Sequence, residues 1–172
     1  MPPAAGLFGL SCHGKITGES VDLDPDRRWL REAIRASRSC LPSPTAYSVG
    51  AVIVDEHGRE RSRGFSRDRD PVVHAEQSAL LRLGGSGADL SRSTIYTSME
   101  PCTVRRSAPR TCADLIIAAR LRRVVLALPE PPLFARCLGI ETLRNAGIEV
   151  VTIPDLGAEV EAINAALLAT AD

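Results

Sequence analysis

Three candidate metal ligands and one free carboxylate stand out in this sequence. His74 and Glu76 belong to a His-Ala-Glu triplet, and Cys102 and Cys112 follow later, the first of them directly after Pro101. A structural zinc site usually closes all four tetrahedral positions with Cys or His, whereas a catalytic site keeps three protein ligands and one open position. One imidazole and two thiolates beside a carboxylate that can move protons therefore predict a catalytic zinc centre.

The order of these residues carries the prediction. A His-x-Glu triplet alone is uninformative, and two cysteines separated by nine residues are spaced more widely than in a zinc knuckle. Together they follow the order of the zinc-deaminase signature, although nine residues replace the two of its Pro-Cys-x-x-Cys half. A structural zinc site, or no metal, is the alternative, but it leaves Glu76 without a purpose.

The flanking sequence predicts how these side chains are positioned. His74 and Glu76 are two positions apart, which would point them to nearly opposite sides inside a helix, so we expect both at a helix entrance. Cys102 and Cys112 should each lie where a strand leads into a helix or in a first helical turn. Unpaired backbone amides at such places favour thiolate over thiol.

Hydrophobic periodicity predicts the element order α-β-β-α-β-α-β-α-β-α. The expected strands cover residues 48–54, the segment that follows the turn of residues 55–58 to about Phe65, and residues 94–99, 123–128 and 148–153. The expected helices begin at Pro25, His74, Cys112, Ile140 and Asp155. Strands separated by helices favour parallel pairing, and the first two strands form a hairpin. The fold class is therefore α/β, a three-layer α/β/α sandwich with a mixed five-stranded sheet.

Composition limits the partners. The 172 residues, 44% hydrophobic and 24% charged, suit one compact domain, which we expect over residues 24–172 after a flexible leader of residues 1–23. Basic and acidic side chains balance at 21 each, which argues against nucleic acid or a membrane as partner. Five cysteines, with no secretory leader or long apolar run, predict a cytoplasmic protein with reduced thiols.

The chain resembles the cytidine deaminase superfamily over most of residues 25–153, and within it the riboflavin-pathway pyrimidine deaminases, particularly the fungal type. The segments that carry the resemblance are residues 45–52, 64–67, 74–80 and 95–102, with the long loop to Cys112. The resemblance implies a cytidine-deaminase-like fold and zinc-dependent hydrolytic deamination of an aminopyrimidine. It assigns His74, Cys102 and Cys112 as zinc ligands and Glu76 as the catalytic proton shuttle.

Six side chains are candidates for substrate binding: Tyr47, Ser66, Arg67, Arg105, Arg106 and Arg110. The tyrosine could stack on a ring or pack in the core. The three arginines between the cysteines could bind a substrate phosphate or belong to a solvated loop. The chain lacks the Asn and the His-rich cysteine loop of bacterial riboflavin deaminases, which indicates a pocket of different shape.

The resemblance favours a diaminopyrimidinone with a phosphorylated ribityl or ribosyl group, an intermediate of riboflavin biosynthesis, as substrate. The alternative is another free base or nucleotide, such as a cytosine nucleotide or a guanine-like heterocycle, in specialised metabolism. A non-catalytic interaction module stabilised by zinc is the non-enzymatic alternative. By analogy with relatives, self-association as a homodimer is an open expectation.

Overall fold

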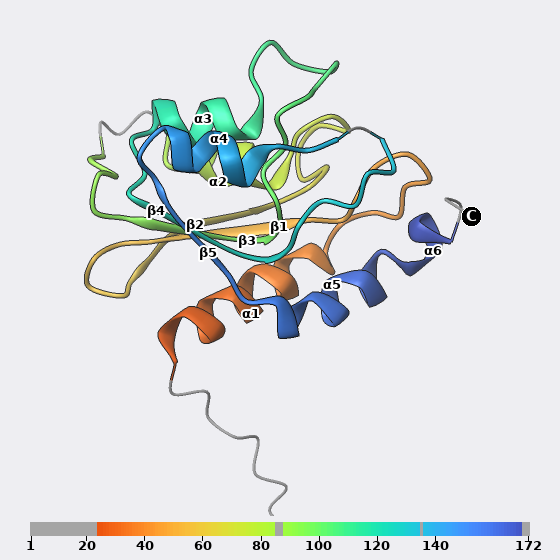
Figure 1. The fold of residues 1–172 in the computed structure, drawn as a ribbon, viewed down its shortest axis with the longest axis horizontal. Helices are drawn as coiled ribbons and strands as arrows, with labels where there is room; N and C mark the ends of the chain where they lie inside the picture. Colours follow the sequence, from red (N-terminus) through yellow and green to blue (C-terminus); the bar gives the residue numbers. More distant parts are fainter. Residues whose placement is uncertain (1–23, 85–87, 135, 170–172) are drawn as a thin grey trace, which may run out of the picture.

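The computed structural model describes residues 24–84, 88–134 and 136–169, which form a mixed five-stranded sheet between two layers of helices (Figure 1). The strands are β1 (Gly50–Val54), β2 (Glu60–Phe65), β3 (Thr94–Met99), β4 (Arg123–Leu128) and β5 (Glu149–Thr152). Their order across the sheet is β2-β1-β3-β4-β5. Strand β1 is antiparallel to β2 and β3, whereas β3, β4 and β5 are parallel. The predicted fold class is confirmed.

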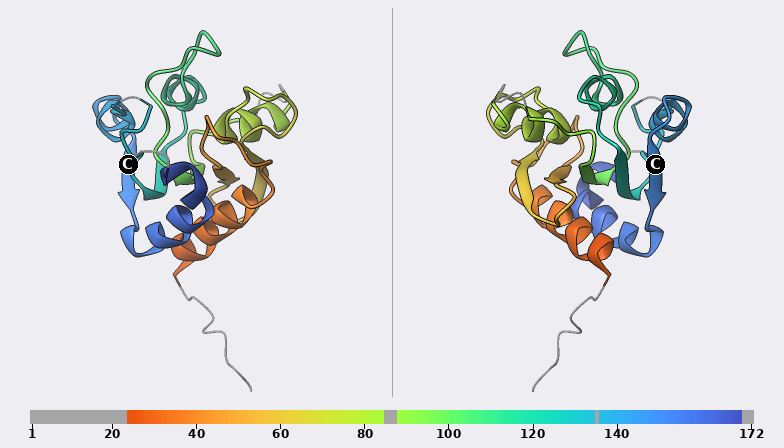
Figure 2. Two further views of the ribbon diagram at one scale, coloured as in Figure 1. Left: turned by 90° about the vertical axis from the view of Figure 1, so that its right-hand side faces the viewer. Right: turned by 90° about the vertical axis from the view of Figure 1, so that its left-hand side faces the viewer.

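Helices cover both faces of the sheet (Figure 2). One layer contains α1 (Pro25–Ser37) and α5 (Gly157–Ile163), and the other contains α2 (Ala75–Arg82), α3 (Cys112–Ala118) and α4 (Gly139–Asn145). Successive strand residues point to opposite faces, so Val52 packs in the core beside α1 while its neighbours Ala51 and Ile53 pack in the core beside α2 and α3. Each face therefore has its own aliphatic core.

The first and last helices show how far local pattern determines structure. Helix α1 begins as predicted, because Pro25 occupies its first turn and the Asp24 carboxylate accepts a hydrogen bond from the amide of Asp26 at 3.0 Å. The prediction of a single C-terminal helix from Asp155 is wrong. A 3₁₀ turn (Pro154–Leu156), α5 and α6 (Ala165–Leu168) replace it.

The break between α5 and α6 lies at the buried Asn164. Its Oδ1 accepts a hydrogen bond from the amide of Ser48 at 2.7 Å, and its Nδ2 donates to the Ser48 carbonyl at 3.2 Å. This side chain thereby completes the backbone hydrogen bonding of Ser48, which lies just before β1.

No helix among the described residues has the length and apolar character needed to cross a bilayer. The leader predicted over residues 1–23 lies outside the described residues, and a single domain over residues 24–172 stays a prediction.

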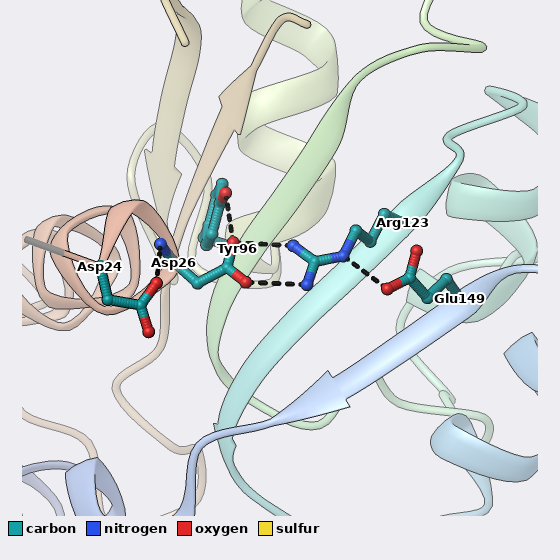
Figure 3. A network of polar contacts seen from close by, with 5 residues as sticks. All are labelled: Asp24, Asp26, Tyr96, Arg123 and Glu149. Atoms are coloured by element: carbon teal, nitrogen blue, oxygen red, sulfur yellow. Dashed lines mark hydrogen bonds and ion pairs between the residues drawn. The ribbon is translucent and has the colours of Figure 1, made fainter.

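A charged network joins α1 to the sheet (Figure 3). The Arg123 guanidinium donates to both carboxylate oxygens of Asp26 at 2.7 Å and to Glu149 at 2.9 Å, and the Tyr96 hydroxyl donates to Asp26 at 2.9 Å. The Asp26 and Arg123 side chains are 24% and 20% exposed, so the pair is largely shielded from water. The Arg123 guanidinium holds the pKa of Asp26 below its usual range.

Replacing Asp26 with Asn should lower the free energy of unfolding by about 1–3 kcal/mol near neutral pH, because Arg123 loses a charged acceptor. The folded-state pKa of Asp26 is lowered, so the carboxylate stabilises the fold fully above its unfolded-state pKa. This stabilisation is lost as pH falls through the folded-state pKa. Denaturant unfolding from neutral to acid pH should show the difference from wild type shrinking, while the exposed control Glu161→Gln changes little. A pH-independent difference would contradict this account.

Candidate active site

Helix α2 brings His74 and Glu76 to the same end of the molecule. His74 is the N-cap residue, with extended backbone (φ −91°, ψ 160°), and its carbonyl accepts from the Ser78 amide at 2.8 Å. Glu76 lies in the first helical turn. The expected helix entrance is confirmed, and it resolves the two-residue spacing because the N-cap residue does not follow the helical periodicity.

The two cysteines reach the same point from opposite ends of a loop. Cys102 follows the end of β3, and Cys112 is the first residue of α3, whose N-cap Thr111 forms a capping box with Asp114. The Cys112 amide donates to the Cys102 sulfur at 3.4 Å. This bond fixes the two sulfurs relative to each other although nine residues separate them in the chain.

The three side chains fit a zinc ion. The Nδ1 atom of His74 lies 3.5 Å from the Cys102 sulfur and 3.4 Å from the Cys112 sulfur. All three ligand atoms lie within 4.8 Å of one another. Zinc–sulfur and zinc–nitrogen bonds at a tetrahedral angle place nitrogen and sulfur about 3.5 Å apart. The spacing and the donor types are therefore those of a Cys₂His zinc site.

A hydrogen bond between the two thiols shifts their pKa values in opposite directions. A hydrogen bond from the Cys112 thiol lowers the pKa of Cys102. The same contact, together with burial, raises the pKa of Cys112. Two close buried sulfurs do not ionise together without a positive charge, so a divalent cation would release the remaining proton.

Glu76 is a buried carboxyl group beside the metal ligands. It is 3% exposed, and burial raises its pKa, with a further rise from the Cys102 charge. The Thr97 hydroxyl lies 3.1 Å from Oε1 of Glu76 and 3.0 Å from the carbonyl oxygen of Met99. A carboxyl group in this setting can both accept and return a proton near neutral pH.

His74, Glu76 and Cys102 line a cavity of about 600 Å³, which is large enough for a nucleotide-sized ligand. Tyr47 and Phe134 form an aromatic contact on its wall, with ring centroids 5.3 Å apart in an edge-to-face arrangement. The Tyr47 hydroxyl donates to the Pro131 carbonyl at 3.1 Å. Tyr47 therefore both packs against the protein and faces the cavity.

Ser66 and Arg67 also line this cavity, but their polar atoms already have protein partners. The Ser66 hydroxyl accepts from the Val49 amide at 3.2 Å. The Arg67 guanidinium donates to the carbonyls of Leu41 at 2.7 Å and Tyr47 at 2.9 Å. These bonds hold the segment before β1 against the end of β2, so the two side chains shape the cavity wall.

The three arginines of the intercysteine loop separate in the structure. Arg105 and Arg106 line the cavity, whereas Arg110 is exposed and does not contribute to its wall. Arg105 donates through Nη2 to the Val72 carbonyl, while its Nη1 atom is buried without a hydrogen-bond partner among the described residues. A buried guanidinium nitrogen in this state is suited to an anionic group of a ligand.

Sequence reasoning missed two further carboxylates, Glu100 and Glu130, which also line the cavity. The buried Glu100 accepts from the Ile140 amide at 2.9 Å and from the Glu130 amide at 3.1 Å. It therefore ties the segment before Cys102 to helix α4 and to the loop after β4. Their position in the sequence could have identified them, because both residues follow predicted parallel strands. The carboxyl ends of such strands form ligand-binding crevices.

Residues 23–128 match the family described as the cytidine and deoxycytidylate deaminase zinc-binding region. A diaminohydroxyphosphoribosylamino-pyrimidine deaminase from Schizosaccharomyces pombe is 37% identical over 125 residues, which cover 72% of this chain and 31% of that protein. The expected resemblance to riboflavin-pathway deaminases, a fungal one among them, is confirmed. The family description names a zinc-binding region, which agrees with the predicted zinc cofactor.

Two solved structures are similar to this chain. RibD from Acinetobacter baumannii superimposes with a TM-score of 0.73 at 28% identity, covering 86% of this chain and 40% of that one. A diaminohydroxyphosphoribosylaminopyrimidine deaminase/5-amino-6-(5-phosphoribosylamino)uracil reductase from Thermotoga maritima gives a TM-score of 0.70 at 31% identity, covering 81% and 39%. The chain thus spans well under half the length of these relatives.

Replacing Gly139 with Ala should weaken zinc binding about 10- to 100-fold, because a Cβ atom there would lie 2.0 Å from the Pro101 carbonyl oxygen. Relief of that clash moves the backbone next to Cys102. The control is Gly157→Ala, where the new Cβ would meet its nearest atom at an ordinary 3.4 Å. Zinc affinity measured by competition with a chelator, with circular dichroism to follow the fold, should separate the two variants. Equal affinities would contradict a supporting role for Gly139.

Proposed function

Because the chain belongs to the cytidine and deoxycytidylate deaminase zinc-binding family, we propose that it catalyses the hydrolytic deamination of an aminopyrimidine. The observation that carries the proposal is the convergence of His74, Cys102 and Cys112 beside the buried carboxyl group of Glu76 in one cavity. A closed structural zinc site would have no use for that carboxyl group. This arrangement therefore favours an enzyme over a non-catalytic interaction module.

In this mechanism His74, Cys102 and Cys112 hold the zinc ion, which when bound lowers the pKa of water toward neutrality. Glu76 accepts a proton from the attacking water and returns it to the ring nitrogen next to the amino-bearing carbon. The water oxygen becomes a carbonyl, the carbon–nitrogen bond breaks, and Glu76 delivers the second proton to the departing ammonia. The raised pKa of Glu76 suits both roles, and the Thr97 hydroxyl orients its carboxyl group.

The favoured substrate is a diaminopyrimidinone with a phosphorylated ribosyl or ribityl group, the riboflavin intermediate. The printed name of the Schizosaccharomyces pombe relative and the cavity of about 600 Å³ support this choice. Arg105 and Arg106 on the cavity wall would receive the phosphate, and Arg105 has a buried nitrogen available. Tyr47 would pack against the ring, while Ser66 and Arg67 maintain the wall around it. Arg110 does not line the cavity and is assigned no contact.

The proposal includes a cytoplasmic location, where thiols remain reduced and can bind zinc. The partner is a small heterocycle, because the balanced charge of the chain offers no electrostatic attraction to a polynucleotide or an anionic membrane. Assembly as a homodimer stays a prediction that rests on the resemblance alone.

Changing Glu76 to Gln should leave zinc bound and reduce ammonia release about 10²- to 10⁴-fold, because the amide cannot carry a proton between water and ring. Elemental analysis together with an ammonia assay measures both quantities on one preparation. The matched comparison is Cys112→Ser, which should lose zinc and activity together. Undiminished turnover in Glu76→Gln would contradict the proposed role of Glu76 in proton transfer.

A substrate panel tests the proposed reaction. Zinc-loaded protein should release ammonia from the phosphorylated diaminopyrimidinone with a higher kcat/KM than from cytidine monophosphate, guanine or single-stranded DNA. Cavity size, Arg105 and the family relationship lead to this expectation. Turnover of a cytosine nucleotide or of guanine with none of the diaminopyrimidinone would assign the chain to the alternative substrate class.

A further inference from the structure

The third carboxylate of the cavity has no role in the mechanism above. Glu76 transfers protons, and the two oxygens of Glu100 already accept backbone amides at 2.9 and 3.1 Å. Glu130 lines the same cavity, and its carboxylate has no cationic partner among the described residues. Burying a carboxylate without a cation is costly unless hydrogen-bond donors surround it. A donor on the ligand would satisfy this one.

The backbone around Glu130 is held in place from both sides. The Glu130 amide donates to Glu100 at 3.1 Å, and the carbonyl of the next residue, Pro131, accepts from the Tyr47 hydroxyl at 3.1 Å. Both anchors belong to the cavity wall. The backbone that carries this carboxylate is thus held at the carboxyl end of β4, beside the segment that carries Cys102.

The surroundings of Glu130 suit an acceptor for a neutral donor. Burial raises the pKa of Glu130 to about 7, with smaller contributions from the charges of Cys102, Glu76 and Glu100. The Cys137 thiol is a hydrogen-bonding neighbour, but its sulfur also lies 3.5 Å from the Pro101 carbonyl, which competes for its proton. A thiol is a weak hydrogen-bond donor, so a ligand N–H would form a stronger hydrogen bond with the Glu130 carboxylate than the Cys137 thiol does.

Heterocycles that lose an amino group differ in what flanks the reacting carbon. In cytosine-type rings that carbon lies between one ring nitrogen and a C–H group. In isocytosine- and guanine-type rings it lies between two ring nitrogens, one of which carries a hydrogen. Glu76 serves one nitrogen as proton donor, and in the second class the remaining N–H needs its own acceptor.

We infer that Glu130 is a specificity-determining residue whose carboxylate accepts a hydrogen bond from this second ring N–H. The inference rests on the proposed function and narrows its substrate class to isocytosine- or guanine-type rings, to which the diaminopyrimidinone belongs. Cytosine-type rings place a C–H group at that position and leave the carboxylate unpaired. The protein should therefore bind cytosine-type rings more weakly, because the Glu130 carboxylate would lack a hydrogen-bond donor in those complexes.

The test compares Glu130→Leu, Glu130→Asp and the exposed control Glu161→Gln, each with its zinc content measured. For the phosphorylated diaminopyrimidinone, Glu130→Leu, which has no acceptor, should raise KM about 10- to 100-fold with kcat changed much less. Glu130→Asp keeps a carboxylate acceptor on a shorter side chain and should fall between wild type and Glu130→Leu. The inhibition constant of cytidine monophosphate should change less than about threefold, because no N–H contact is lost.

A binding measurement separates failure of this inference from failure of the proposed function. The deaminated product, a pyrimidinedione, keeps the ring N–H, so calorimetry should show its affinity for zinc-loaded protein falling about 10- to 100-fold in Glu130→Leu. Unchanged product binding, or equal losses for the diaminopyrimidinone and the cytosine nucleotide, would overturn the role of Glu130. Absence of turnover in fully zinc-loaded wild-type protein, with product binding still dependent on Glu130, would overturn the proposed reaction alone.

Discussion

One imidazole nitrogen that lies 3.5 and 3.4 Å from two cysteine sulfurs sets the main constraint on this structure. Three separate segments must deliver their side chains to a single point. Two of those segments are helix starts, whose free amides and positive dipole ends favour thiolate and carboxylate groups. The third is the loop after β3, which is held by the Glu100 carboxylate and by the close approach of Gly139. Catalytic geometry here depends on backbone contacts outside the ligand set.

Stability and chemistry are located at different ends of the sheet. The Asp26–Arg123 pair joins α1 to the start of β4, whereas the cavity lies at the carboxyl ends of β3 and β4. Parallel strands place their carboxyl ends on one edge, and the loops there can vary without disturbing the aliphatic cores. The charged network can therefore hold the layers together while leaving the cavity free for ligand.

Environment differentiates the three carboxylates of the cavity. Glu76 is buried beside the sulfurs and has a raised pKa, Glu100 is occupied by two backbone amides, and Glu130 is half-buried with a thiol neighbour. We therefore propose different roles for the same functional group: Glu76 carries protons and Glu130 accepts from a ligand N–H, whereas Glu100 is a structural tether. Side-chain chemistry alone would not distinguish them, because the difference lies in solvation and in available donors.

The sequence by itself determined the zinc-binding residue types, the helix entrance at His74 and the succession of helices and strands along the chain up to β5, because these depend on local spacing and hydrophobic periodicity. Only the tertiary structure showed that the Arg67 guanidinium is hydrogen-bonded to backbone carbonyls. It also showed that Arg110 does not line the cavity, whereas Glu100 and Glu130 do. The same holds for the helix break at Asn164, whose partner Ser48 is 116 residues away. Such contacts arise when crossover connections bring distant segments together, and they have no signature in the local sequence.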